Sequence, residues 1–154
     1  AGSAATGEAA ARRFEAKIAA LKARHQGARP VRVFYEIWPQ PLMTLNGQHM
    51  VSQAITLCGG ENVFAALGPL APTVSVEAVL GARPELILAP SEAGQASAEA
   101  LAAWRRWPQL PAVHYRNLAG IDGNLLNRSG PRFAEGAEQL CATLAAARRR
   151  LPPR

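Results

Sequence analysis

The sequence predicts one α/β lobe, a Rossmann-like three-layer fold in which a mostly parallel sheet follows a long helix. Three observations predict this class. Short apolar segments such as Val31–Ile37 alternate with segments of helical periodicity. Prolines and glycines separate the two kinds of segment. A chain of 154 residues, 49% of them hydrophobic, has the size of one domain with its own core. This alternation is typical of a parallel sheet covered by helices on both faces.

The first predicted element is an Ala-rich amphipathic helix over residues 7–25. Its apolar residues Phe14, Ile18 and Leu21 recur at helical spacing. A glycine and a proline follow closely and end the helix.

The next predicted unit is a strand, a loop and a helix. Val31–Ile37 is rich in β-branched and aromatic residues, which favour a buried strand. Trp38–Gly47 contains two prolines and is predicted as a loop. A helix from Gln48 to Cys58 follows, and Gly59 and Gly60 end it. Its predicted apolar face comprises Met50, Val51, Ala54, Ile55 and Cys58.

The second half of the chain continues the alternation. Ser75 is a predicted N-cap, and Pro131 stands at a favoured first helical position. In chain order the predicted elements are a strand at 62–64, a helix at 76–81, a strand at 85–89, a helix at 97–104, a strand at 112–115, a loop at 120–130 and a final helix from residue 131. The stripe of that helix comprises Phe133, Ala137, Leu140, Cys141 and Leu144.

The net charge of +6 raises the question of a nucleic-acid partner. The cations gather on the first helix, where glutamates lie among them, and at the end of the last helix, where they complement the helix dipole. Neither cluster is interleaved with aromatic residues. We therefore expect no nucleic-acid partner.

Catalytic and metal-binding patterns are absent from the sequence. The sequence contains no G-x-S-x-G context and no phosphate loop after a strand, and no paired carboxylates follow the first predicted strand. The three histidines and two cysteines lack the spacing of zinc ligands. We therefore expect no enzyme activity, no cofactor and no metal site. No apolar run has the length of a membrane span, and no signal-peptide core is visible. These features fit a cytosolic protein or the mature or truncated form of an exported one.

Two segments carry a family resemblance: VFYEIWPQPLMTLNGQHMVSQAITLCGGENVF (Val33–Phe64) and RSGPRFAEGAEQLC (Arg128–Cys141). They resemble the C-terminal lobe of the periplasmic cobalamin-, haem- and siderophore-binding proteins that feed ABC importers, and the resemblance extends over residues 7–151. It implies that residues 1–30 are the backbone helix between two lobes and that 31–154 are the C-terminal lobe. An N-terminal lobe would then precede this chain.

The resemblance implies a periplasmic protein without catalysis. It would capture cobalamin, haem or a ferric siderophore and deliver the ligand to an ABC permease in the inner membrane. The alternative is a cytosolic enzyme or assembly factor of the same lobe architecture that acts on a metal cluster or a tetrapyrrole. Oxidised cysteines favour export, whereas free thiols favour the cytosol.

The predicted ligand loop follows the carboxyl end of the first strand, where open α/β sheets bind ligands. The resemblance places Ile37 and Met43 where the cobalamin binders carry aromatic side chains, with Trp38 and Gln40 beside them. Tryptophan and methionine offer polarisable contact area to a large flat ligand. The alternative is that Trp38 or Met43 covers the core.

The resemblance also places Arg128 in the cleft. The family has an acidic residue four positions earlier, whereas this chain has Asn124, with Asp122 nearby. We expect Arg128 to bind a carboxylate or the negative edge of a metal chelate through paired hydrogen bonds. The alternative is a solvated arginine or one that pairs with Asp122.

Three further expectations depend on the resemblance. Glu77, in the first turn of its helix, would dock onto arginines of the permease; the simpler reading is a carboxylate that favours the helix N-terminus. Cys58 and Cys141 would form a disulfide. Without its second lobe, the chain would expose the helix stripe near Phe14 and self-associate there.

Overall fold

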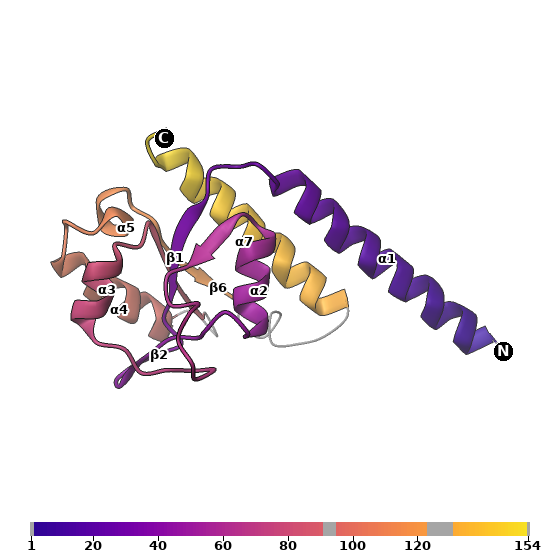
Figure 1. The fold of residues 1–154 in the computed structure, drawn as a ribbon, viewed down its shortest axis with the longest axis horizontal. Helices are drawn as coiled ribbons and strands as arrows, with labels where there is room; N and C mark the ends of the chain where they lie inside the picture. Colours follow the sequence, from indigo (N-terminus) through magenta and orange to yellow (C-terminus); the bar gives the residue numbers. More distant parts are fainter. Residues whose placement is uncertain (1, 91–94, 123–130, 154) are drawn as a thin grey trace.

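The computed structural model describes residues 2–90, 95–122 and 131–153 (Figure 1). A four-stranded parallel sheet with the order β4-β1-β5-β6 forms its middle layer. The strands are β1 (Val31–Tyr35), β4 (Gly60–Asn62), β5 (Leu86–Pro90) and β6 (Leu118–Ile121). The predicted class, a parallel α/β lobe preceded by a long helix, is confirmed.

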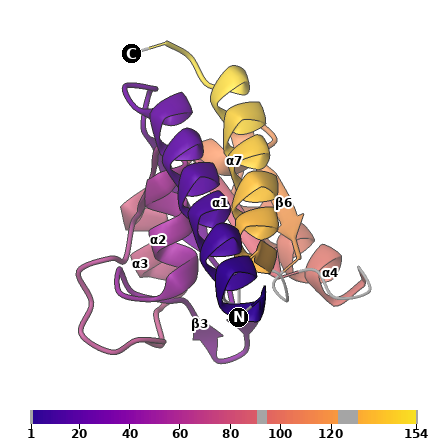
Figure 2. The same ribbon diagram turned by 90° about the vertical axis from the view of Figure 1, so that its right-hand side faces the viewer.

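Helices cover both faces of the sheet. On one face lie α2 (Met50–Leu57) and α7 (Pro131–Arg150), with α1 (Gly2–His25) packed on both of them. On the other face lie α3 (Val76–Ala82), α4 (Gln95–Ala103), the 3-10 turn η1 (Trp104–Arg106) and α5 (Pro111–His114). Figure 1 shows α1 running beside α7, with its N-terminal end pointing away from the sheet, and Figure 2 shows the same pair from the side.

Alternation along β1 divides the core into two clusters. Val31, Val33 and Tyr35 face the α2–α7 side, whereas Phe34 faces the side of α3, α4 and η1. Phe34 there contacts Trp104 edge to face at 5.7 Å between ring centroids. These four of the five β1 side chains are at most 3% exposed, which explains why this strand is apolar almost throughout.

The predicted stripe of the first helix faces its own lobe. Leu21 is buried in the α2–α7 cluster, and Phe14 and Ile18 are partly exposed. An ion pair of 3.2 Å between Lys17 and Glu138 joins α1 to α7 at the surface. Self-association through Leu21 would therefore require exchange of α1 between copies, and it stays a prediction.

The predicted strand Ala112–Tyr115 is wrong. The segment forms α5, with Pro111 at its first turn, and Ala112 is buried against the sheet. The strand comes later, as β6, and its last two residues fall in the segment predicted as the loop 120–130. Pairing with β5 makes Leu118–Ile121 a strand although this segment contains a glycine.

Other boundaries shift by a few residues. The predicted loop Trp38–Gly47 contains a short antiparallel hairpin, β2 (Trp38–Pro39) and β3 (Leu42–Met43). The α2 helix begins at Met50, whose side chain is 39% exposed and does not belong to the buried face. The strand predicted at residues 62–64 lies at Gly60–Asn62.

The two glycines after α2 have different roles. Gly59 has a φ of +81°, which favours glycine and ends the helix. At Gly60 an added Cβ would lie 2.7 Å from Ile55 Cγ2 and from Leu144 Cδ2. A side chain at position 60 would therefore displace these residues, because β4 lies close to both α2 and α7.

The predicted disulfide is present. Cys58, the C-cap residue of α2, is bonded to Cys141 of α7, with 4.8 Å between the Cα atoms. Arg148 of α7 reinforces this junction, since it donates to the carbonyl oxygens of Cys58 at 3.1 Å and of Arg29 at 2.7 Å. Within the described ranges, no helix has the length and apolar character of a membrane span.

Candidate functional site

The β2–β3 hairpin stands at the carboxyl edge of the sheet, directly after β1. Trp38 pairs with Met43, and the Ile37 N–H donates to the Met43 carbonyl oxygen at 2.9 Å. The Trp38 indole Nε1 donates to the carbonyl oxygen of Gln40 at 3.0 Å, across the turn. The predicted ligand residues Ile37, Trp38, Gln40 and Met43 therefore share one ordered hairpin.

A second segment, residues 65–74, runs antiparallel beside the hairpin. The Val74 N–H donates to the Leu42 carbonyl oxygen at 2.9 Å, and the Thr44 N–H donates to that of Pro72 at 3.0 Å. The buried Asn46 fixes the first half of this segment, because its Nδ2 donates to the carbonyl oxygens of Leu67 and Gly68, both at 3.1 Å. The hairpin and this segment thus form one supported surface.

Four large apolar side chains are exposed in the hairpin, in the 65–74 segment and at the start of α2, and we call them the apolar rim. They are Trp38 at 58%, Leu70 at 53%, Met50 at 39% and Leu67 at 37% exposed. Large apolar side chains that stay exposed are candidates for contact with a ligand or a partner. Sequence reasoning missed Leu67 and Leu70 as site residues; their only signal is that each is an apolar residue in a loop rich in glycine and proline.

The predicted ligand residues differ in how accessible they are. The exposure of Trp38 excludes the alternative in which it covers the core. Gln40 is exposed, whereas Met43 and Ile37 are half-buried, and Ile37 packs partly against the α2–α7 cluster. Asn124 and Arg128 lie outside the described residues. Their role in ligand binding stays a prediction.

Glu36 is a buried acid at the carboxyl end of β1, and sequence reasoning missed it. Its side chain is 4% exposed, and its Oε1 accepts a hydrogen bond of 3.2 Å from Trp104 Nε1. Its Oε2 has no hydrogen-bond partner among the described residues. Burial raises the pKa of Glu36 to about 7, although the Trp104 hydrogen bond acts in the opposite direction. The available signal was an acidic residue at the end of an otherwise apolar strand.

Glu77 lies in the first turn of α3, which begins where the 65–74 segment ends. The Ser75 hydroxyl caps this helix by accepting from the Ala78 N–H at 3.0 Å. The Glu77 side chain is exposed and makes no hydrogen bond or ion pair with any residue that the structure describes. An exposed, unengaged carboxylate at this edge is what a docking residue requires.

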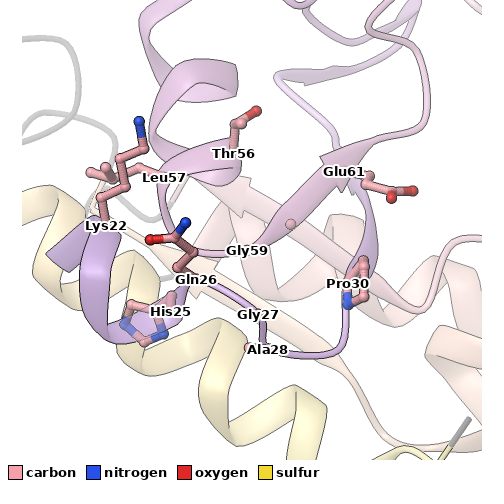
Figure 3. A pocket seen from close by; sticks show the side chains of 11 residues that line it. Lys22, His25, Gln26, Gly27, Ala28, Pro30, Thr56, Leu57, Gly59 and Glu61 are labelled. Atoms are coloured by element: carbon pink, nitrogen blue, oxygen red, sulfur yellow. The ribbon is translucent and has the colours of Figure 1, made fainter.

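A cavity of about 280 Å³ lies at the opposite edge of the sheet (Figure 3). The C-terminal ends of α1 and α2 and the start of β4 form it, and Lys22, Gln26, Thr56 and Glu61 are among its lining residues. His25 is another, and burial and the charges of Arg148 and Arg24 lower its pKa. Because the amino ends of the strands meet here, this cavity is separate from the apolar rim.

A protein-family comparison matches residues 1–125 to a model described as "Periplasmic binding protein". Among curated proteins, the chain is 34% identical over 139 residues to the vitamin B12-binding protein of Vibrio cholerae serotype O1. The match covers 90% of this chain and 49% of that protein. The chain thus spans about half the length of the curated relatives it matches.

Solved structures share the architecture. The periplasmic vitamin B12-binding protein of Vibrio cholerae superposes with a TM-score of 0.78 at 34% identity, over 92% of this chain and 54% of that one. The periplasmic heme-binding protein of Roseiflexus sp. RS-1 superposes with the same TM-score at 23% identity, over 92% of this chain and 56% of that one. At 23% identity, the similarity to the heme-binding protein shows only that the two chains share a fold.

Proposed function

Because this chain belongs to the periplasmic binding protein family, we propose that it is the C-terminal lobe of the substrate-binding component of an ABC importer. The complete protein holds a chelated nutrient, namely cobalamin, haem or a ferric siderophore, between this lobe and an N-terminal lobe. It works in the periplasm and passes the ligand to a permease in the inner membrane. Its role is binding and docking, without catalysis. Residues 1–30 join the two lobes.

The apolar rim is the observation that carries this proposal. A chelate such as cobalamin or haem presents a broad, partly apolar surface, and Trp38, Met50, Leu67 and Leu70 offer a matching surface at the ligand edge of the sheet. Hydrogen bonds from the hairpin and from Asn46 hold this surface in shape before any ligand arrives. The 34% identity to a vitamin B12-binding protein supports cobalamin as the first ligand to test.

The alternative function, an enzyme or assembly factor in the cytosol, has less support. The relatives described above are named as binding proteins. The Cys58–Cys141 disulfide also fits an oxidising compartment such as the periplasm.

A Trp38→Ala change tests the ligand surface. Enclosing an aromatic side chain against a ligand contributes about 1.5–3 kcal/mol, so its removal should weaken binding at least about tenfold. Folding stability should change little, because Trp38 is 58% exposed and donates one hydrogen bond within its own turn. Calorimetric titration with cobalamin, haem and a ferric siderophore measures the first quantity, and urea unfolding measures the second.

The titration should use the complete protein, in which this chain is joined to its N-terminal lobe. A cleft shared by two lobes loses about half its contacts when one is absent, so this chain alone should bind weakly. Gln26→Ala, in the cavity at the opposite edge, is the control and should bind like the unmodified protein. Unchanged affinity of Trp38→Ala for all three ligands would remove the hairpin from the site.

A Glu77→Gln change tests the docking role. The variant should retain its stability within about 1 kcal/mol, since the lost helix-terminus interaction is worth no more. Capture of the loaded two-lobed protein by its importer in detergent should weaken roughly tenfold, and Glu77→Lys should weaken it further through like-charge repulsion. Ligand affinity should not change. A Glu77→Lys protein with reduced ligand affinity and normal capture would place Glu77 in the ligand site instead.

A further inference from the structure

The strand β6 forms one edge of the sheet and pairs only with β5 within the described ranges. The Ile87 N–H donates to the Asn117 carbonyl oxygen at 3.0 Å, so the backbone carbonyl group of Asn117 points toward β5. In a parallel ladder, alternate residues of a strand face the same neighbour. Leu118 and Gly120 therefore direct their N–H and C=O groups outward. No residue that the structure describes pairs with these outward groups.

A cavity adjoins β6 on each face of the sheet. The first, of about 340 Å³, lies between β6 and α7, and Ala119, Ala142 and Thr143 are among the residues that line it. The second, of about 400 Å³, lies on the side of η1 and α5. Arg116 and Leu118 line both cavities, so the two lie on either side of the same open edge. Figure 2 shows β6 at this side of the molecule, next to α7.

This pair of cavities matches the geometry of an added strand. A peptide that pairs with the edge of a sheet directs successive side chains to opposite faces. Each face of β6 offers a space to receive them. Ala142 and Ala146 contribute small apolar side chains to the cavity on the α7 side, and Val113 contributes an apolar side chain to the cavity on the other side.

The charge of the edge indicates what the added strand carries. Arg150 lines the first cavity, Arg105 lines the second, and Arg116 lines both, while neither cavity has a described acidic residue in its lining. Arg150 donates to Asn117 Oδ1 at 3.1 Å. The guanidinium groups of Arg105 and Arg116 make no hydrogen bond or ion pair with the described residues. A guanidinium group that has no partner within its own chain can bind a carboxylate through paired hydrogen bonds.

We propose that the outer edge of β6 binds an extended acidic segment of a partner protein, which adds a strand to the sheet and places carboxylates near Arg105 and Arg116. The site lies away from the apolar rim, so it does not depend on the proposed ligand function. A second copy of this chain is a poor occupant, because two β6 edges would bring the same arginines together in a chain of net charge +6.

The direct probe is a short blocked peptide, acetyl-TVEEVT-amide, whose adjacent glutamates point to opposite faces when it is extended. Nuclear magnetic resonance of the ¹⁵N-labelled chain should show its largest shifts at Leu118–Ile121 and at Arg116. The matched peptide acetyl-TVKKVT-amide should bind at least about tenfold more weakly. A peptide methylated on its backbone nitrogens should also bind at least tenfold more weakly, because the added strand loses its hydrogen-bond donors.

Variants of the chain test the same edge. Gly120→Pro removes an outward N–H without removing a bond to β5, and prolines are tolerated on edge strands in that orientation. It should weaken peptide binding at least about tenfold relative to Gly120→Ala. The double change Arg105→Glu with Arg116→Glu should also weaken peptide binding at least about tenfold. The control, Arg12→Glu with Arg13→Glu on α1, changes the net charge equally and should leave peptide binding unchanged.

Three results would overturn the proposal. One is failure of the acidic peptide to bind at millimolar concentration. Another is equal binding of the acidic and lysine peptides. The third is a dimer in sedimentation equilibrium that the Gly120→Pro change dissociates, because a second copy would then occupy the edge. If Gly120→Pro lowers the helical circular dichroism signal, the methylated peptide and the arginine variants decide the question on the folded chain.

Discussion

Replacing Cys58 and Cys141 together with alanine should lower the free energy of unfolding by about 4 kcal/mol through the lost cross-link alone. The disulfide closes a loop with a sequence separation of 83, so its loss releases a large amount of conformational entropy in the unfolded chain. Both sulfur atoms also lie in the core, with Cys58 at 0% and Cys141 at 2% exposed. Each alanine therefore leaves a small cavity in addition.

The fold itself should survive this change. Ala137, Leu140 and Leu144 of α7 belong to the same buried cluster as Val51 and Ile55 of α2, so apolar contacts still join the two helices. Arg148 continues to hold the C-terminal end of α2 through the residue 58 carbonyl oxygen. The circular dichroism spectrum of the variant should match that of the unmodified chain below the unfolding transition.

Urea unfolding of the oxidised chain, the reduced chain and the double variant provides the measurement. The reduced chain and the double variant should both unfold at a lower urea concentration than the oxidised chain. Their own unfolding midpoints should be similar to each other. Alkylation of the oxidised, denatured chain should modify no cysteine. Equal unfolding midpoints for the oxidised chain and the double variant would show that the disulfide does not stabilise this lobe.

Glu36 should make the stability of the lobe depend on pH. In the folded protein the pKa of this buried carboxyl is about 7, against an ordinary value of 4.5 that it regains on unfolding. The folded chain therefore keeps the proton to higher pH than the unfolded chain does. Stability falls as the pH rises between these two values and is constant above them. The difference between the pKa values corresponds to about 3 kcal/mol.

A Glu36→Gln variant isolates this contribution. The amide can still accept the hydrogen bond from Trp104 Nε1, but it has no charge to lose. Relative to the unmodified chain, the variant should gain about 3 kcal/mol of unfolding free energy between pH 4.5 and pH 8. Comparing the change across pH removes any constant cost of the buried amide, and the contributions of other titrating groups cancel.

Urea unfolding at several pH values measures this difference. Glu61→Gln makes the same chemical change on an exposed side chain of β4 and controls for the loss of one negative charge. Because Trp104 donates to Glu36, its fluorescence should also change with a midpoint near pH 7 in the unmodified chain and not in Glu36→Gln. A pH profile of stability that is the same for both chains would show that Glu36 ionises without a burial penalty.

The sequence was sufficient to predict the class of fold and its central elements. β1, β5, α2 and α7 each bury a continuous or periodic set of apolar residues, and that pattern can be recognised without knowing what covers it. The Ser75 cap and the glycine stop after α2 were predictable for a similar reason. Each depends on a backbone requirement that one residue type satisfies locally. The disulfide pairing came from the family resemblance, since two cysteines alone do not show that they meet.

Only the tertiary structure decided the position of β6, the state of Glu36 and the extent of the candidate site. Leu118–Ile121 is a strand because β5 supplies its hydrogen bonds, and Ala112 lies in a helix although its neighbours favour a strand. In the sequence, nothing shows that the pKa of Glu36 differs from that of an ordinary acidic residue. Its pKa is raised because the side chains packed around it exclude water. Leu67 joins Trp38 in the apolar rim because Asn46 holds its loop. Local pattern sets what each segment tends to form, whereas burial, pairing and pKa depend on neighbours that are distant in the chain.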